Sequence, residues 1–480
     1  MNKIDIKNYF YYIIYQIIII VSPLITIPYV SRILGAESIG KYSYTQANVS
    51  MVILFCSLGI NLYAQREMAY EAGNPKNLSK IFNEMVGLRF ITTSIGIALY
   101  VVAILNMKEY KVLYLIQLLD IIVASFDITW AYQALGRFKT IVIRNIIIKI
   151  AFILMVFLCV KTRNDLLKYV ICYSGTKLLG SIYLWITRPS ELKNRSSQEL
   201  HPLRHLRLIL VLFVPQIATQ LYSVLDKSMI GSITRNFYEN GYYEQATKII
   251  HTILTLVTSL GIVMLTKNSR MVKSEGKELL DQKLSNMLRI SIWLSIPIMF
   301  GSILLSPSIV TLILGTDFLK SSVLIQILSI TIFLISISNV IGIQYLIVVN
   351  RHKEFSISVT IGACVNVVLN FILIPHYLSI GAAIASVISE FFVTLIQLYF
   401  VRKEIHEQMK ITLINIAKCF LAAIIMFIIL SIVGSYIYRI QYKMLLQILL
   451  GVVIYFLVSV LLKEENSSKI LNNIKKIVIS

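Results

Sequence analysis

The stretch Tyr11–Val30, YYIIYQIIIIVSPLITIPYV, runs through twenty residues without one charged side chain. About twenty predominantly apolar residues are what a helix needs to cross the hydrocarbon core of a bilayer. Comparable runs recur at 290–314, 325–349 and 421–437. Because lipid offers no partners to backbone N–H and C=O groups, such runs must form helices, whereas barrel strands would be about half as long. The stretch therefore predicts the first of many membrane-spanning helices.

The composition of the 480 residues is typical of a chain that is largely surrounded by lipid. Hydrophobic residues make up 57% of the sequence and charged residues only 14%, too few to cover a water-exposed surface. The formal net charge of +21 would suggest a nucleic-acid partner in a soluble protein. Here the basic residues concentrate in alternate loops, and the positive-inside rule places those loops and both termini in the cytoplasm. We expect an all-α polytopic membrane protein of about fourteen helices, with no nucleic-acid partner.

The longest connection between apolar segments, residues 188–207, divides the spans into two groups. Three features recur at matching places in these groups: a proline in the first span, a glycine opening the second, and a basic turn between the fourth and fifth. The matching pairs are Pro23 and Pro215, Gly40 and Gly241, and the turns 136–139 and 350–353. Such matches predict two six-helix lobes of parallel orientation, related by a pseudo-twofold axis along the membrane normal.

This division gives the expected domain boundaries. We expect an amino-terminal lobe of six spans at 1–187 and a cytoplasmic linker at 188–207. A second lobe of six spans is expected at 208–405, followed by two added spans and a cytoplasmic tail at 406–480.

Polar residues follow one face of the seventh predicted span. Gln216, Gln220 and Lys227 share this face, because they are spaced by four and seven residues. Tyr29 and Arg32 belong to a similar stripe in the first span. A polar face is costly in lipid and predicts a wet cavity. The alternatives are a polar seam between packed helices and, for Arg32, a side chain that reaches the outer interface.

Further cations at membrane depth would give such a cavity a positive charge. They are Arg89 in the third span, Lys149 in the fifth, Lys177 in the sixth and Lys248 in the eighth. A cationic cavity attracts anions. Taken singly, each of these residues could instead be an interfacial anchor whose charge reaches water.

Acids inside the predicted spans are candidates for coupling transport to an ion. They are Asp120, Asp127, Asp226 and Glu390. Each could bind a proton or a sodium ion. Ion pairing with the nearby cations explains them equally well, because a lone charge in lipid is costly in either role.

The sequence carries no motif that predicts an enzyme. It contains no HExxH, no glycine-rich phosphate loop followed by Lys-Ser/Thr, and no Ser/His/Asp arrangement outside the spans. We therefore expect no catalytic residues, no cofactor and no metal site. Without a nucleotide site, uphill transport would draw on ion gradients or on the membrane potential.

Several motifs resemble those of Wzx-type polysaccharide repeat-unit flippases. The most specific is SPLITIPYVSRILG at 22–35, and DITW at 127–130, LDKSMIG at 225–231 and GYYE at 241–244 add to it. The resemblance extends over most of the chain. It implies the multidrug/oligosaccharidyl-lipid/polysaccharide (MOP) exporter superfamily, with a MATE-like fold whose two lobes form a V-shaped central cavity.

The resemblance implies a flippase that moves undecaprenyl-pyrophosphate-linked oligosaccharides outward across the bacterial plasma membrane, for O-antigen, capsule or exopolysaccharide synthesis. The expected partners are this lipid-linked oligosaccharide, membrane lipids, a coupling proton or sodium ion, a polysaccharide polymerase and a chain-length regulator. Lys227, Arg32 and Lys248 would contact pyrophosphate, and Gln216 and Gln220 would contact sugar. The remaining candidates for the cavity wall complete the set: Tyr29, Arg89 and Lys149.

Three other functions stay open. A drug or cation antiporter and a lipid II flippase would share the scaffold, and they differ from a repeat-unit flippase in cavity charge and substrate size. A membrane polysaccharide polymerase or ligase would also be an apolar protein with many spans. Such enzymes carry a large external loop, and the external loops expected here are short.

Overall fold

The computed structural model describes the backbone of residues 3–71, 73–107, 109–193, 199–406 and 409–479. Within these ranges it describes the side chains except those of residues 3–20, 211–212, 214–216, 218–223, 259–267, 269–270, 273–275, 409–410 and 473–479. The described part of the chain is helical and contains no strand. It forms two compact units, Met1–Gly241 and Tyr242–Ser480, which are called unit 1 and unit 2 below.

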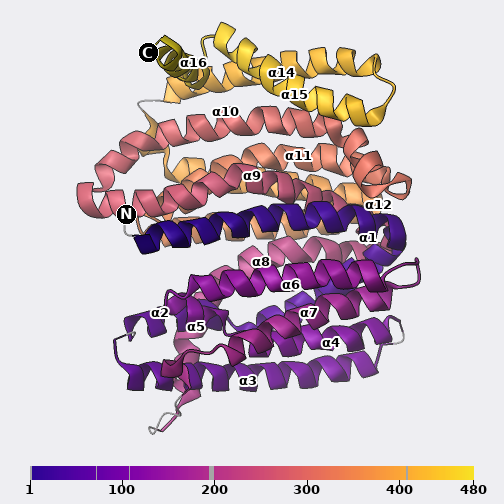
Figure 1. The fold of residues 1–480 in the computed structure, drawn as a ribbon, viewed down its shortest axis with the longest axis vertical. Coiled ribbons are helices and arrows are strands. Elements are labelled where there is room, and N and C mark those ends of the chain that lie inside the picture. Colours follow the sequence, from indigo (N-terminus) through magenta and orange to yellow (C-terminus); the bar gives the residue numbers. More distant parts are fainter. Residues whose placement is uncertain (1–2, 72, 108, 194–198, 407–408, 480) are drawn as a thin grey trace. The chain divides into compact units, whose positions relative to one another are not determined.

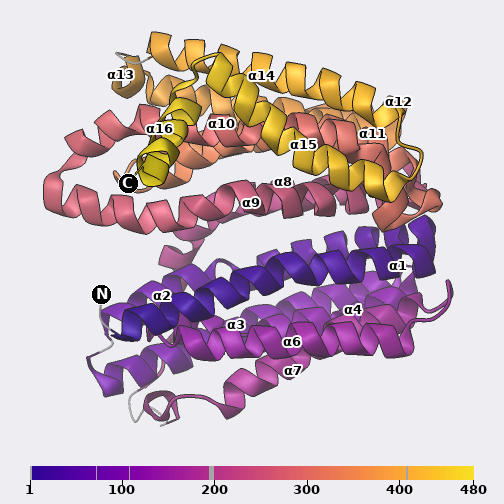
Figure 2. The same ribbon diagram turned by 45° about the horizontal axis from the view of Figure 1, so that its top comes forward.

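Unit 1 is a bundle of long helices with short helical pieces at one end (Figure 1). The elements are α1 (Lys3–Ser57), α2 (Ile60–Tyr70), α3 (Pro75–Leu105), α4 (Lys111–Phe126), α5 (Thr129–Ala134), α6 (Phe138–Cys159), α7 (Leu166–Ile186), η1 (Ser190–Leu192), η2 (Pro202–His205), α8 (Leu206–Thr234) and the first residues of α9 (Phe237–Glu275). Helices α6 and α7 lie side by side in both ribbon views, and α4 packs against α7 (Figures 1 and 2).

The first two predicted spans belong to one helix, α1, that is broken at Gly35. This residue has a left-handed backbone (φ 72°, ψ 172°), which glycine adopts without steric cost. Beyond the break, Gly40 lies against the start of α9. A Cβ at Gly40 would come within 1.7 Å of the Phe237 carbonyl oxygen, and one at Gly241 within 2.0 Å of that of Ala36. The two glycines that the sequence pairs as repeat positions thus allow two backbones to approach each other.

Unit 2 contains the remaining helices. They are the rest of α9, α10 (Lys277–Ile309), the π-helical η3 (Val310–Leu314), η4 (Thr316–Phe318), α11 (Lys320–Ser338), the π-helical η5 (Asn339–Leu346), α12 (His352–Phe400), α13 (Arg402–Ile405), α14 (Met409–Ser435), α15 (Ile440–Leu461) and α16 (Glu465–Ile479). Helices α14 and α15 lie side by side in both views (Figures 1 and 2). The core of this unit is built around α10, with buried side chains such as Leu284, Ile292, Ile341 and Tyr345.

Helix α12 is also two segments joined at a break. Leu378 has a non-helical backbone (φ 55°, ψ −133°), and Pro375 precedes it by three residues. Proline removes a backbone donor and destabilises the helix around it, which accounts for the break at this place. Gly381 follows, where a Cβ would lie 2.5 Å from the Leu373 carbonyl oxygen. The predicted eleventh and twelfth spans correspond to the two segments.

Nine helical segments among the described residues are long and apolar enough to cross a membrane. This number takes the broken helices α1 and α12 as one segment each, and it leaves out the long helices α7, α8 and α9. The predicted number of about fourteen crossings and the domain boundaries at 187, 207 and 405 stay predictions. The contacts between helices place α8 in unit 1.

Many large apolar side chains are exposed on the helices, and polar side chains are buried among the apolar ones inside. Along α3, Ile91, Ile95, Leu99 and Val102 form an exposed stripe, and Leu99 is 69% exposed. By contrast, Gln117 is completely buried on α4. An apolar exterior around polar side chains is what lipid as the solvent favours.

Candidate functional site

A group of amide and hydroxyl side chains joins α1, α4 and α8 inside unit 1. The Asn48 side-chain amide donates to the Tyr114 hydroxyl at 2.8 Å, and the Ser228 hydroxyl donates to the Asn48 side-chain oxygen Oδ1 at 2.6 Å. Three residues after Tyr114, the Gln117 side-chain amide donates to the Gln46 side-chain oxygen Oε1 at 3.4 Å. The Gln117 Oε1 atom is buried and accepts no hydrogen bond from the described residues. These contacts form a polar seam that continues toward α7.

Next to this seam, aromatic rings and lysines from α1, α6 and α7 form what we call the tyrosine–lysine cluster: Tyr42, Lys149, Phe152, Tyr169, Tyr173 and Lys177. Tyr42 packs edge-on against Tyr169 and Tyr173, with ring centroids 5.2 and 5.9 Å apart. Phe152 contacts the same two tyrosines at 6.0 and 5.6 Å. Such edge-to-face contacts fix the orientation of the rings.

One lysine approaches a ring of this cluster, and a second lies on the helix face of another. The Lys177 Nζ atom lies 4.0 Å from the centroid of Tyr173, and Lys149 precedes Phe152 by three residues on α6 and shares its helix face. Both side chains are partly buried on helices whose outer faces are apolar. A ring face favours a cation above it, so Tyr173 holds positive charge at this depth.

One acid lies beside the lysines. The Asp120 Oδ1 atom is 3.4 Å from Lys177 Nζ, and the Asp120 side chain is only 1% exposed. Its Oδ2 atom is buried and accepts no hydrogen bond from the described residues. The pair Asp120–Lys177 agrees with ion pairing, one of the two roles left open for this acid. With Lys149 included, the cluster and Asp120 carry a net charge of +1, so an anion is favoured there over a cation.

The α8 residues that the sequence singles out are described only in part. The side chains of Gln216 and Gln220 lie outside the described residues. Asp226 is buried and Lys227 is partly buried, next to Ser228, which contacts α1. The Asn240 amide donates to the Lys227 backbone carbonyl at 2.8 Å, which ties the end of α8 to the start of α9. Lys227 therefore lies at the edge of the polar seam.

Two other predicted cavity residues of unit 1 have partners within the protein. The Arg89 guanidinium is 3% exposed and donates to the Asn61 side chain and to the Asp127 backbone carbonyl. The Tyr29 hydroxyl donates to the Val160 carbonyl at 2.8 Å, and its ring lies 4.1 Å from that of Phe157. These partners favour a structural role for both residues. Arg32 is exposed on α1.

The remaining candidates have different surroundings. The Asp127 carboxylate accepts from the backbone N–H and the hydroxyl of Thr129, the first residue of the short helix α5. In unit 2, Lys248 Nζ lies 2.9 Å from Glu244 Oε1 one turn earlier on α9, and Glu390 is buried on α12. The structure thus places Asp120 beside Lys177 and Lys149 on the helix face of Phe152, and it gives Asp127 and Lys248 local partners.

Sequence reasoning missed most of this site. Tyr42, Tyr169 and Tyr173 lie in apolar spans, where an aromatic residue is typical of a packed core. Gln117 could have been found, because it precedes Asp120 by three residues and shares its helix face. Gln46 and Asn48 could also have been found, because they are amide side chains within the predicted second span. Which helices face each other could not be read from one sequence.

Comparisons with known proteins give the following similarities. A family model described as polysaccharide biosynthesis protein matches residues 6–265. A Shigella dysenteriae protein is 25% identical over 393 residues, which cover 78% of this chain and 94% of the relative. An Escherichia coli K12 protein is 26% identical over 410 residues, or 84% of this chain and 98% of the relative. Both carry the name "Putative O-antigen transporter".

Solved structures resemble this fold at low sequence identity. The structure named "Lipid II flippase MurJ, inward closed conformation" matches with a TM-score of 0.72 and 17% identity, over 95% of this chain and 98% of that one. An inward-facing MATE family transporter of the MOP superfamily matches with a TM-score of 0.64 and 13% identity, over 81% and 96% of the two chains. The predicted fold class, an all-α polytopic membrane protein of the MATE-like kind, is confirmed.

Proposed function

Because this chain belongs to the polysaccharide biosynthesis protein family, we propose that it is a flippase for lipid-linked oligosaccharide repeat units. It would move undecaprenyl-pyrophosphate-linked oligosaccharides from the cytoplasmic to the outer face of the bacterial plasma membrane by alternating access. The product would serve O-antigen, capsule or exopolysaccharide synthesis. The names of the relatives support transport, since they describe O-antigen transporters and not enzymes.

The tyrosine–lysine cluster is the observation that carries the proposal. A hydrophilic sugar cannot cross hydrocarbon unaided, because each buried hydroxyl would lose its hydrogen bonds. Tyr42 is buried and packs against Tyr173, which is partly exposed and presents an apolar ring and a hydroxyl at the same depth. Lys149 and Lys177, both partly buried, add two cations, which suit a pyrophosphate. The lipid tail of the substrate can stay in the bilayer along the apolar exterior.

Within this proposal the site residues have different weights. Lys149 and Lys177 would contact pyrophosphate first, and Lys227 and Arg32 would contact it along the path. Gln216 and Gln220 would contact sugar. The wall would also include Tyr29, Arg89 and Lys248. Their roles would be mainly structural, because each has a partner within the protein.

Coupling to an ion is a further part of the proposal. Asp120 is the strongest candidate among the acids, since it is buried and one of its oxygens has no partner among the described residues. Protonation of Asp120 would release Lys177 for the substrate. Asp226 and Glu390 are second candidates, and Asp127 is the weakest because its carboxylate already accepts two hydrogen bonds from Thr129. An inside-negative potential would also favour outward movement of an anion, by about 2.3 kcal/mol per charge per 100 mV.

The proposal includes the membrane topology and the partners. Both termini would lie in the cytoplasm, because the basic loops then face inward. A polysaccharide polymerase and a chain-length regulator would act on the product at the outer face. A proton or a sodium ion would be the coupling ion.

The side of the membrane on which intermediates accumulate tests the proposed function. In a strain that lacks this protein, lipid-linked repeat units should accumulate on the cytoplasmic face, protected from reagents added outside intact cells. Accumulation of unpolymerised units on the outer face would indicate a polymerase or ligase and contradict a flippase.

Variants of the cluster test the site separately. Lys149→Ala with Lys177→Ala should lower polymer export at least about tenfold in the complemented strain, because two cations leave the path. Lys161→Ala, which removes an exposed lysine between α6 and α7, is the matched control and should export normally. A stably inserted Lys227→Ala variant that exports at the normal rate would remove Lys227 from the path.

A further inference from the structure

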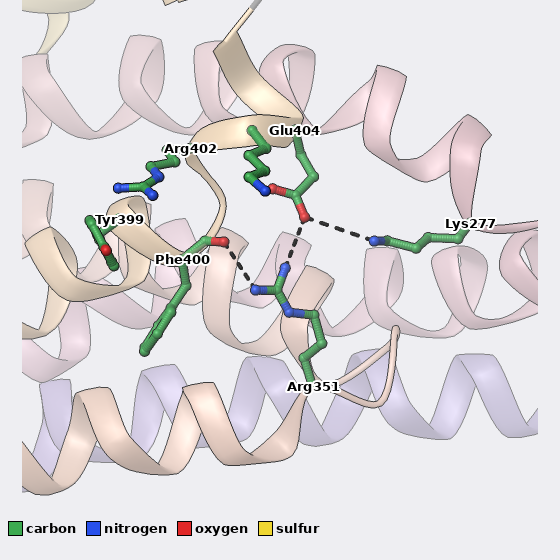
Figure 3. A pocket seen from close by; sticks show the side chains of 7 residues that line it. Lys277, Arg351, Tyr399, Phe400, Arg402 and Glu404 are labelled. Atoms are coloured by element: carbon green, nitrogen blue, oxygen red, sulfur yellow. Dashed lines mark hydrogen bonds and ion pairs between the residues drawn. The ribbon is translucent and has the colours of Figure 1, made fainter.

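A basic pocket lies in unit 2 where α12 ends and α13 begins (Figure 3). It encloses about 400 Å³. Four cations line it, Lys277, Arg351, Arg402 and Lys403, together with one acid, Glu404. All of these residues come from helix ends or turns, so the pocket is at the end of the bundle and not within a span.

Arg351 forms the floor of the pocket and is fixed by three acceptors. Its Nη1 atom donates to Glu404 Oε1 at 2.8 Å, its Nη2 atom to the Phe400 carbonyl at 3.0 Å, and its Nε atom to Glu354 Oε1 at 2.9 Å. In Figure 3 this guanidinium points at Glu404. The corner between α12 and α13 is therefore held in place before any ligand arrives, which lowers the entropy cost of binding.

The charge at the mouth of the pocket is positive. Arg402 and Lys403 are both exposed, and no carboxylate lies within 4.0 Å of either in the described part of the chain. Lys277 Nζ lies 3.8 Å from both Asp281 and Glu404, longer than a direct hydrogen bond. Counting Asp281, Glu354 and Glu404 against the four cations leaves a net charge of +1, and the excess lies at the mouth.

An exposed apolar stripe on α12 leads to this mouth. Phe391, Leu395 and Tyr399 follow at steps of four and are all exposed, which places them on one face of the helix. The Arg402 guanidinium lies 4.2 Å from the centroid of the Tyr399 ring. A tyrosine with arginine and lysine at the end of an apolar helix face is typical of the membrane–water interface.

We propose that this pocket binds the phosphate headgroup of an anionic phospholipid of the surrounding bilayer. Arg402 and Lys403 contact the phosphate, Lys277 adds charge from the opposite wall, and an acyl chain lies along Phe391 and Leu395. The continuity of the charged mouth with the apolar stripe is the reason to assign a lipid, because a free phosphate would use only the mouth. Basic pockets between spanning helices are suited to such headgroups.

Thermal unfolding of the purified full chain in neutral detergent tests this site. The added probe is phosphatidylglycerol, phosphatidylcholine or inorganic phosphate, and the dependence of Tm on its concentration gives an apparent affinity. Phosphatidylglycerol should raise Tm more than phosphatidylcholine does. Arg402→Ala with Lys403→Ala should weaken phosphatidylglycerol binding about tenfold or more and leave the Tm without lipid nearly unchanged.

Two variants control for charge and for folding. Lys76→Ala with Lys80→Ala removes two lysines of α3 that do not line the pocket, and should keep the wild-type affinity. Arg402→Lys with Lys403→Arg keeps both charges and should also bind. Equal binding by the wild type and the Arg402/Lys403 alanine variant would overturn the site. A Tm shift of the same size with inorganic phosphate would overturn its assignment to a lipid.

Discussion

The corner at Arg137 in unit 1 and the corner at Arg351 in unit 2 share a backbone but differ in their surroundings. Gly136 and Asn350 both have positive φ, at 67° and 62°. The next residues have φ −85° and ψ 51° at Arg137, and φ −88° and ψ 51° at Arg351. Each arginine N–H donates to a carbonyl five residues earlier, at 2.8 Å in both corners. A helix begins directly after each arginine.

The two side chains also make similar contacts of different strength. Arg137 pairs with Glu191 at 2.9 Å, and both side chains are exposed. Arg351 pairs with Glu404 at 2.8 Å, at 24% and 14% exposure, and additionally binds Glu354 and the Phe400 carbonyl. Each unit also has an arginine over an aromatic ring. Arg188, after the end of α7, lies over Trp185, and Arg402, after the end of α12, lies over Tyr399. The same local geometry thus gives a surface pair in one unit and a partly buried network in the other.

The difference shows that a repeated sequence motif specifies the local backbone conformation but not how much the arginine side chain stabilises the fold. The predicted match of turns 136–139 and 350–353 corresponds to a real match of backbone angles, as a repeat would give. The lobe symmetry itself stays a prediction. Burial around Arg351, supplied by Tyr345, Asp281 and the α12–α13 corner, decides how much each arginine contributes.

The largest difference is expected for loss of the arginine itself. Arg351→Ala should lower the free energy of unfolding by about 2–4 kcal/mol, because it leaves Glu404 partly buried without its main partner. Arg137→Ala should cost less than about 1 kcal/mol, since its pair is exposed to solvent. Thermal unfolding of both variants in detergent measures this. Equal losses of unfolding free energy in the two variants would show that burial around Arg351 does not increase its contribution to stability.

A smaller difference is expected at the turn residue. Gly136→Ala should cost about 1 kcal/mol, because a Cβ is unfavourable in the left-handed region. Asn350→Gly should be neutral or slightly stabilising, since it relieves a non-glycine residue of positive φ. The same unfolding measurement compares them. A neutral Gly136→Ala would contradict the shared backbone of the two corners.

The next smaller difference in stability is expected between the two arginines that lie over aromatic rings, Arg188 and Arg402. Arg188 lies 5.2 Å from the Trp185 ring and 5.7 Å from the Phe82 ring, and it is half-buried. Arg188→Ala should therefore cost about 0.5–1 kcal/mol of stability. Arg402→Ala should cost less, since its side chain is exposed and stacks on one ring only. A larger loss for Arg402→Ala would give Arg402 a structural role in place of a binding one.

The smallest effect concerns pH. The Glu191 backbone N–H and the Arg137 guanidinium hold the pKa of Glu191 below its ordinary value. A lowered pKa stabilises the folded state above the ordinary value, near pH 4.5, and this contribution is lost as pH falls through the folded pKa. Because Glu191 is exposed, this pH-dependent contribution to the free energy of unfolding should be less than about 0.5 kcal/mol, and Glu191→Gln should remove it. Unfolding followed between pH 6 and about pH 3 checks the sign.

The sequence was sufficient for the class of fold and for part of the site. Long apolar runs predict spanning helices, and they do so because lipid leaves the backbone no other choice. Gly35 and Leu378 as break points were not predicted, since both breaks depend on backbone angles that no periodicity records. Lys149 and Asp120 were expected at the site because charges in spans are rare. Tyr173 was not, because the packing of Tyr42 and Phe152 against its ring depends on which helices face each other.

The central claim is that this chain moves a lipid-linked oligosaccharide across the bilayer through the tyrosine–lysine cluster. It is tested most directly in vesicles that contain the purified full chain and a fluorescent pyrophosphate-linked oligosaccharide lipid. The loss of fluorescence to an impermeant quencher reports transfer to the outer leaflet. We expect transfer well above that of empty vesicles, a reduction of about tenfold in the Lys149/Lys177 alanine variant, and a normal rate in Lys161→Ala. Transfer no faster than in empty vesicles, or equal rates in all three proteins, would contradict the account.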